Sequence, residues 1–199
     1  MVKGILFVLS GPSGTGKGTV CKKLLEREKE LCLSVSMTTR ECREGEIPGV
    51  TYNYVSKETF KGMIDNDEML EYAVYNGNYY GTPREAVDSL LSSGKDVLLE
   101  IEPQGALQVK KLFPEAVLIF LVPPSMKELK NRLVSRGRES SEEIEERIKA
   151  AKWELAQAEK YSVHIVNDDL DVCTQNIIDY LNEKRGERRM IDKLINEEA

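Results

Sequence analysis

The sequence has few of the residues from which metal sites and covalent catalysts are built. Its 199 residues include one histidine, His164, and four cysteines with no C-x-x-C pair among them. Zinc sites need several cysteine and histidine ligands at short spacings, so no zinc site is expected. Scattered cysteines are typical of a reducing compartment, and we therefore expect four unbridged thiols.

Long hydrophobic runs are absent as well. The sequence has no stretch of the roughly 18 consecutive apolar residues that a membrane span needs. The apolar run at residues 5–9 is too short for a secretory signal, and no small-residue cleavage site follows it. We expect a cytoplasmic protein without a membrane partner.

Excess positive charge is missing too. The chain carries 28 Lys and Arg residues against 34 Asp and Glu residues, a net charge of −6. Proteins that follow nucleic-acid phosphates usually carry a basic surplus, so no nucleic-acid partner is expected. A chain of this length that is 41% hydrophobic and 31% charged predicts one globular domain with a substantial core.

Apolar runs alternate with helical periodicity along most of the chain. The runs at residues 4–10, 97–101, 116–122 and 163–166 predict buried strands. Capping boxes at 125–128 and 140–143, and an apolar face at positions 144, 148, 151, 155 and 158, predict helices between them. This order predicts the α/β class, with a parallel sheet and right-handed crossovers.

Residues 34–94 fit that rhythm less well, being rich in tyrosine, glycine and charge. We interpret them as an inserted lobe. Its last helix is expected to begin with Thr82 as the cap and Pro83 at the first helical position.

The strongest chemical signal is the segment GPSGTGKGT at residues 11–19, between a predicted strand and a predicted helix. Glycines there let backbone N–H groups converge on phosphates, and the helix N-terminus adds positive potential. The segment predicts an ATP-binding phosphate loop in which Lys17 contacts the β- and γ-phosphates. Its members are Gly11, Pro12, Ser13, Gly14, Thr15, Gly16, Lys17, Gly18 and Thr19.

The loop departs from the usual pattern at one position. The residue after the lysine normally supplies a hydroxyl to Mg²⁺, but here it is Gly18, and Thr19 comes one residue later. The Mg²⁺ that accompanies ATP is therefore expected to depend more on Glu100, either directly or through water. Glu100 ends an apolar run, as a metal-binding acid near a phosphate loop does.

A second cluster places Arg40 and Arg43 among hydroxyl groups and ahead of Tyr52 and Tyr54. Two arginines can clamp a dianionic phosphate through charge-assisted hydrogen bonds. Taken alone, the arginine spacing is usual for a solvated surface pair, and strand packing alone would explain Tyr52 and Tyr80.

The motifs taken together resemble the guanylate kinase family, the P-loop kinases of GMP. The phosphate loop, S-x-T-T-R-x-x-R-x-G-E at 36–46, GNYYGT at 77–82, LEIEPQG at 99–105 and VNDD at 166–169 occur in the family's order. The resemblance covers nearly the whole chain. It implies a P-loop NTPase-type parallel sheet flanked by helices, within one domain spanning 1–199. The implied parts are a core (1–33, 95–125 and 152–199), a GMP-binding lobe (34–94) and a lid (126–151).

The resemblance also implies the reaction, transfer of the γ-phosphoryl group of ATP to GMP, and to dGMP, in purine nucleotide metabolism. The GMP-binding positions carried over are Ser36, Arg40, Arg43, Tyr52, Glu71, Tyr80, Thr82, Glu100 and Glu102. The two arginines and two tyrosines would hold the phosphate, while Ser36, Glu71, Thr82 and Glu102 would face guanine. The family more often carries Asp where this chain has Glu102.

Glu71 suits guanine on chemical grounds. Guanine offers N1–H and an exocyclic amine as adjacent donors, whereas adenine offers an acceptor at N1. A carboxylate can accept both guanine donors, and such hydrogen bonds discriminate strongly between bases. Without the resemblance, an exposed acid is an equal interpretation of Glu71, and a helix cap is an alternative role for Thr82.

A third cluster gathers Arg132, Arg136, Arg138 and Arg147 in sixteen residues. Pairing with nearby glutamates on the surface is one interpretation. The resemblance implies instead that Arg132, Arg136 and Arg147 belong to a lid that closes over the triphosphate, and it assigns no role to Arg138. Asn167 would contact the ATP base, or it would form an Asx turn into the next helix.

The implied mechanism needs no catalytic base, because the attacking phosphate oxygen of GMP is already ionised near neutral pH. Lys17, Mg²⁺ and the lid arginines Arg132, Arg136 and Arg147 would offset charge along an in-line path. Two alternatives remain open. A kinase of another nucleoside monophosphate should lack Glu71 and Glu102, and a non-catalytic binding relative should have lost Lys17.

Overall fold

The computed structural model describes residues 3–75, 77–135 and 141–197. They divide into two compact units, one of residues 3–8 and 31–118, the other of residues 9–30 and 119 onward. The division falls inside two strands, β1 (Leu6–Ser10) and β8 (Val117–Val122), so both strands contribute to both units.

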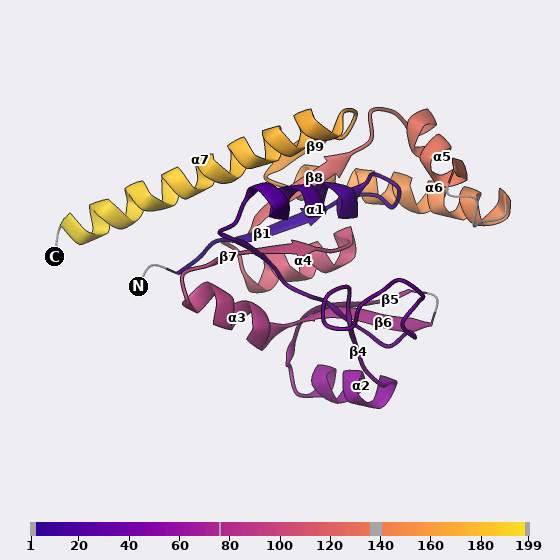
Figure 1. Cartoon of the computed structure of the whole chain (residues 1–199), viewed down its shortest axis with the longest axis horizontal. Helices are drawn as coiled ribbons and strands as arrows, with labels where there is room; N and C mark the ends of the chain where they lie inside the picture. Colours follow the sequence, from indigo (N-terminus) through magenta and orange to yellow (C-terminus); the bar gives the residue numbers. More distant parts are fainter. Residues whose placement is uncertain (1–2, 76, 136–140, 198–199) are drawn as a thin grey trace. The chain divides into compact units, whose positions relative to one another are not determined.

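A five-stranded sheet has the order β2-β7-β1-β8-β9 (Figure 1). Its other strands are β2 (Leu31–Leu33), β7 (Asp96–Glu100) and β9 (Val163–Val166). β2 is parallel to β7, and β8 is parallel to β9. Every residue of β1 is buried, as expected of a strand covered on both faces. The predicted parallel α/β sheet and its four predicted strands are confirmed.

The first unit also contains a four-stranded sheet of order β4-β3-β6-β5. The strands are β3 (Met37–Thr38), β4 (Asn53–Tyr54), β5 (Met69–Tyr75) and β6 (Asn78–Pro83). Helix α2 (Lys57–Asp65) packs against this sheet through Phe60, whose ring lies 5.3 Å from that of Tyr79. The segment that did not fit the βα rhythm therefore forms a small mixed sheet built around the β5–β6 hairpin, in which β3 is antiparallel to β6 and parallel to β4.

Helix α3 (Arg84–Ser92) corrects one expectation. Thr82 was expected to cap this helix, but Thr82 is part of β6, and the cap position is Pro83 with extended backbone. The reason is that the Thr82 hydroxyl is already committed to the Glu71 carboxylate across the hairpin, 2.7 Å away. Helix α4 (Pro103–Leu112) completes the unit.

The second unit is mainly helical, with α1 (Lys17–Arg27), α5 (Met126–Ser135), α6 (Ser141–Ala156), a 3₁₀ turn (Ala158–Lys160) and α7 (Leu170–Glu197). Leu129 and Leu133 of α5 bury against Ala151 of α6. The predicted cap of α5 is confirmed, because the Ser125 hydroxyl accepts a hydrogen bond of 3.1 Å from the Glu128 N–H. The second predicted box begins at Ser140, which lies outside the described residues.

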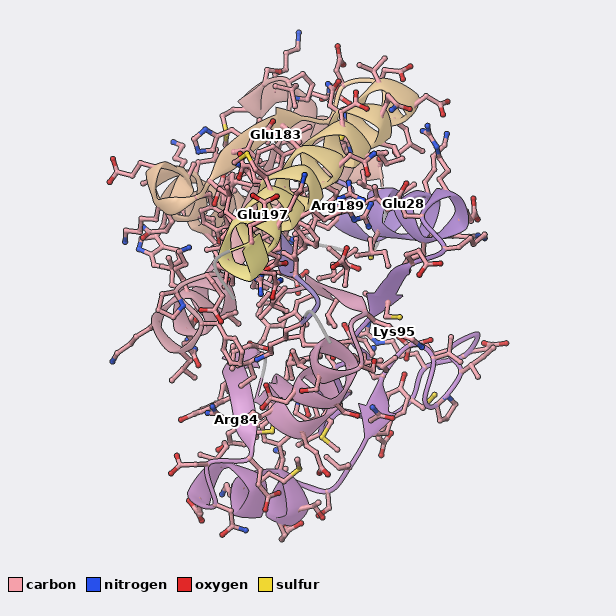
Figure 2. The ribbon with its side chains drawn as sticks, turned by 90° about the vertical axis from the view of Figure 1, so that its left-hand side faces the viewer. Glu28, Arg84, Lys95, Glu183, Arg189 and Glu197 are labelled. Atoms are coloured by element: carbon pink, nitrogen blue, oxygen red, sulfur yellow. The ribbon has the colours of Figure 1, made fainter. Side chains whose placement is uncertain are left out.

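Helix α7 has two different halves. Its first half buries one face, including Ile177 and Leu181, and packs on β9. Its last three turns expose Met190, Leu194 and Ile195, each more than half exposed. Figure 2 shows Glu183, Arg189 and Glu197 along this helix.

No helix among the described residues is long and apolar enough to cross a membrane. All four cysteines are free thiols, which confirms the expectation that they are unbridged.

Candidate active site

The phosphate loop is the turn between β1 and α1 in the second unit. β1 ends at Ser10 and α1 begins at Lys17, so the loop opens directly into a helix N-terminus. Gly16 is the cap of α1 and has a φ of 91°, in the left-handed region that favours glycine. A side chain there would also meet Asn167, since a Cβ would lie 2.7 Å from its Nδ2. Both facts require glycine before the lysine.

Lys17 is folded over the loop itself. Its side chain is buried, and its Nζ donates to the carbonyl oxygens of Gly11 at 2.6 Å and Pro12 at 3.4 Å. Thr15 closes the turn, since its hydroxyl donates to the same Pro12 carbonyl at 2.7 Å. The loop therefore holds a cation at its centre, where a phosphate has to bind. Gly18 and Thr19 are exposed at the start of α1.

Asn167 connects this loop to the ends of two strands and to α5. Its buried Nδ2 donates to the Thr15 carbonyl at 2.7 Å, and its own carbonyl accepts a 3.0 Å bond from Arg132. Its backbone N–H donates to Val122, the last residue of β8, at 2.9 Å. The turn into α7 is made instead by Asp169, whose Oδ1 accepts the N–H groups of Asp171 and Val172. The Asx turn expected in this segment belongs to Asp169.

Two of the arginines predicted to form a lid have definite contacts among the described residues. Arg132 donates from Nε to Glu128 at 2.9 Å, one turn away on α5, and this bond lowers the pKa of Glu128. Arg147 of α6 donates to the hydroxyl of Ser13 in the phosphate loop at 2.5 Å. The second unit therefore brings Lys17, Ser13 and Arg147 together. Arg136 and Arg138 lie outside the described residues.

In the first unit, Arg40 is held by Glu46, for which no separate role was expected from the sequence. Glu46 accepts two hydrogen bonds from the Arg40 guanidinium, at 2.6 and 2.7 Å. It also accepts from the backbone N–H of Arg43 and the hydroxyl of Tyr54, both at 2.8 Å. The bond from Arg40 is the main reason that the pKa of Glu46 falls to about 2. The sequence signal for this role of Glu46 is its position as the last residue of the motif at 36–46, which also contains Arg40 and Arg43.

Aromatic rings surround the same guanidinium. The Arg40 Cζ lies 5.2 Å from the ring centre of Tyr52 and 5.7 Å from that of Tyr54. Tyr80 packs edge-on against Tyr52, with 5.9 Å between ring centres. The structure thus brings together three of the four residues predicted to hold the GMP phosphate. The fourth, Arg43, is exposed, although its backbone joins the Glu46 cluster.

The predicted guanine reader Glu71 is 4% exposed on β5. It stands opposite Thr82 in the hairpin register, and the Thr82 hydroxyl donates to its Oε1 at 2.7 Å. Burial raises the pKa of Glu71 to about 7, while hydrogen bonds from Thr82 act in the opposite direction. Such a buried carboxylate, perturbed mainly by desolvation, is typical of a functional site.

The remaining predicted residues lie at the ends of strands or at a helix cap. Ser36 is half-buried just before β3. Glu100 ends β7, and its charge helps to raise the pKa of Tyr52 after burial, the largest cause. Glu102 is the exposed cap residue of α4, and its backbone is extended, the conformation that the following Pro103 favours. No cluster of three or more His, Cys, Asp or Glu side chains suited to a metal occurs among the described residues.

A phosphate loop between the first strand of a parallel sheet and its following helix, with arginines on α5 and α6, defines a P-loop nucleotide-binding protein of the α/β class. A family model described as guanylate kinase matches residues 3–184 of the chain. The chain therefore belongs to the guanylate kinase family.

Individual relatives agree with the family match. The chain is 52% identical to a guanylate kinase of Oceanobacillus iheyensis over 191 residues, 96% of this chain and 93% of the relative. It is also 52% identical to a guanylate kinase of Thermus thermophilus over 194 residues, 97% of this chain and 88% of the relative. A crystal structure of guanylate kinase from Anaplasma phagocytophilum superposes with a TM-score of 0.76 at 34% identity, covering 92% of this chain and 87% of that one.

Proposed function

We propose that this chain transfers the γ-phosphoryl group of ATP to GMP, giving ADP and GDP, and accepts dGMP as well. The observation that carries the proposal is the buried Glu71 carboxylate, held by Thr82 in a lobe that also contains an arginine clamp. A kinase of another nucleoside monophosphate has no use for this carboxylate, because adenine and the pyrimidines lack guanine's adjacent donors. A non-catalytic binding module would not retain Lys17.

On the GMP side, Arg40, Arg43, Tyr52 and Tyr80 bind the phosphate. Glu46 occupies two N–H groups of Arg40, the Glu41 carbonyl occupies a third, and the side chain of Tyr80 is a further hydrogen-bond partner of the guanidinium. A bound phosphate would share this held guanidinium with Tyr80. Ser36, Glu71, Thr82 and Glu102 face the guanine. Glu71 accepts from N1–H and from the exocyclic amine, and Thr82 keeps the carboxylate in place.

On the ATP side, residues 11–19 wrap the phosphates, and Lys17 exchanges its carbonyl partners for phosphate oxygens. Asn167 supports the loop through the Thr15 carbonyl. The lid arginines Arg132, Arg136 and Arg147 neutralise charge on the transferring group, with Arg147 positioned at Ser13.

The donor set suits Mg²⁺ bound with ATP. Mg²⁺ prefers oxygen ligands, keeps several waters and binds through one or two carboxylates plus phosphates, so it needs no dedicated protein cage. Glu100, at the end of β7, would hold it directly or through water, since Gly18 has no hydroxyl to offer. When bound, the ion neutralises charge on the β- and γ-phosphates.

The chain's own residues need only to position the two nucleotides and to neutralise charge on the reacting phosphates. The attacking oxygen belongs to a GMP phosphate that is ionised near neutral pH, so no side chain has to remove a proton. Closure of the lid (126–151) and the GMP-binding lobe (34–94) over the core would exclude water from the reacting phosphates. A cytoplasmic location belongs to the same proposal.

The test is a coupled assay of ADP release with ATP and Mg²⁺, offering GMP, dGMP, AMP, CMP and UMP in turn. We expect turnover on GMP and dGMP alone, and a loss of at least 100-fold in Lys17→Ala, because one preorganised charge at a transition state contributes about that much. Preference for AMP or a pyrimidine nucleotide would refute the assignment of the guanine site. Absence of turnover on all five would favour a binding module.

A further inference from the structure

We infer that Gln108 of α4 is a positioning residue for base selection, because it fixes the strand that carries Glu71. The inference rests on the proposed role of Glu71 as the guanine reader. Gln108 itself touches no reacting atom and acts through the β5 backbone.

The first observation is a double hydrogen bond between a side chain and a strand. Gln108 donates from Nε2 to the Tyr72 carbonyl at 2.8 Å, and its Oε1 accepts from the Tyr72 N–H at 3.2 Å. Both backbone groups of one residue are thus paired with one side-chain amide. This is the pattern that a neighbouring strand would supply, and β5 is the outer strand of its sheet.

The second observation is where that bond falls. Tyr72 directly follows Glu71, and the hairpin register is irregular between Met69 and Glu71. A strand that slips by one residue turns every side chain to the opposite face. Few contacts oppose such a slip in an irregular outer strand. The two hydrogen bonds from Gln108 hold Tyr72, the residue next to Glu71, in one register.

The third observation is that the same face of α4 adjoins the carboxylate itself. Gly105 lies one turn before Gln108, and a Cβ on Gly105 would lie 2.3 Å from Oε2 of Glu71. Helix α4 therefore leaves space for the Glu71 carboxylate at Gly105, and it holds the adjacent β5 backbone at Tyr72 through Gln108. Thr82 fixes Oε1 from the opposite strand.

Loss of the Gln108 bonds should affect recognition of the guanine base and not of the phosphate. A displaced Glu71 loses its alignment with the pair of guanine donors but leaves the phosphate clamp intact. IMP carries the N1–H of GMP and lacks the exocyclic amine, so it depends less on that alignment. The ratio of kcat/KM for GMP to kcat/KM for IMP therefore reports the position of the carboxylate.

The experiment measures this ratio for the full-length enzyme, Gln108→Leu, Gln108→Glu and Glu71→Gln. Lys111→Leu, an exposed polar residue of the same helix, is the matched control. In Gln108→Leu we expect KM for GMP to rise about tenfold, with kcat and KM for ATP within twofold, because two hydrogen bonds are lost. The GMP to IMP ratio should fall about fivefold in both Gln108 variants and stay unchanged in the control.

Thermal unfolding of each variant shows whether it is folded, and Gln108→Glu keeps the side-chain shape if Gln108→Leu does not fold. An equal fall in kcat/KM for GMP and for IMP, or no fall in either, would overturn the inference. A merely structural role would lower kcat/KM for both substrates by the same factor. If Glu71→Gln lowers the ratio and both Gln108 variants do not, the inference alone fails. If Glu71→Gln leaves the ratio unchanged, the proposed guanine reader itself is wrong.

Discussion

Two glutamates of the first unit have opposite pKa shifts. Burial raises the pKa of Glu71 to about 7, whereas bonds from Arg40 are the main cause that lowers the pKa of Glu46 to about 2. Glu71 has a hydroxyl partner and no described cation beside it, so desolvation dominates. Glu46 is only 18% exposed at its side chain but has a guanidinium against it. The environment of each carboxylate therefore decides its charge near neutral pH.

The raised pKa of Glu71 predicts how base recognition depends on pH. Only the ionised carboxylate accepts both guanine donors, so recognition is present above pH 7 and is lost as pH falls through that value. We expect kcat/KM for GMP to fall about tenfold between pH 8 and pH 6 because of this group alone. The measurement is a pH profile of kcat/KM.

The control for that profile is Glu71→Gln. The GMP phosphate itself titrates near pH 6, and this variant keeps the phosphate ionisation while losing the one near pH 7. A variant profile with the same ionisation near pH 7 would assign it to another group.

Glu46 predicts a separate effect on phosphate binding. In Glu46→Gln, Arg40 loses its charged partner and its fixed orientation, so we expect KM for GMP to rise about tenfold with kcat nearly unchanged. Steady-state kinetics with varied GMP measure this, and Glu44→Gln in the same exposed loop is the control. A fall in KM for GMP would mean that Glu46 competes with the substrate for Arg40.

Among the structural elements, the end of β9 is hydrogen-bonded to three other parts of the second unit. Asn167 bonds to the phosphate loop, to the end of β8 and to Arg132 of α5. The turn after β9 thereby supports the phosphate loop and α5 together. Nothing in the motif VNDD distinguishes this role from an Asx turn, because the partners of Asn167 come from residues 35 to 152 positions away.

Asn167→Ala should weaken ATP binding through the loop rather than through the base. We expect KM to rise by the same factor, about fivefold, for ATP and for GTP as donors, because the lost bond supports the Thr15 carbonyl. The free energy of unfolding should fall by about 1 kcal/mol, since one buried hydrogen bond is lost. Asp168→Ala, at the exposed neighbouring position, serves as the control. An effect confined to ATP would instead identify a contact with adenine.

Across the chain as a whole, burial in α7 ends well before the helix does. The last buried residue of α7 is Leu181, while Arg185 still forms an ion pair with Glu28 at 2.6 Å. The family match likewise ends at residue 184. The final turns therefore contribute little to the packed core.

Truncation after Gly186 tests this division of α7. The shortened chain should keep kcat and both KM values within twofold, and its thermal midpoint should change by only a few degrees, because no buried apolar residue is removed. Leu181→Ala in the full-length chain should be far more damaging, by about 3 kcal/mol, since it opens a cavity at a fully buried leucine. A large loss on truncation would show that the exposed turns have a partner.

Much of this protein is predictable from local pattern. Glycine spacing between a strand and a helix predicts the phosphate loop around Lys17, and continuous apolar runs predict the parallel strands, since both depend on neighbouring residues. The order of motifs, through the family resemblance, predicts Arg40, Tyr52, Glu71 and Tyr80 as site residues. The fold adds the distances between these side chains.

Other features depend on contacts between distant segments, which no local pattern contains. Thr82 has the sequence signature of a helix cap, yet it serves Glu71 because the hairpin register places the two opposite each other. Glu46, Gln108 and Asn167 are polar residues of ordinary appearance, and each acquires its role from a partner brought near by folding. Hydrogen-bond geometry and burial are properties of the packed chain, and they decide which polar side chains hold the site in place.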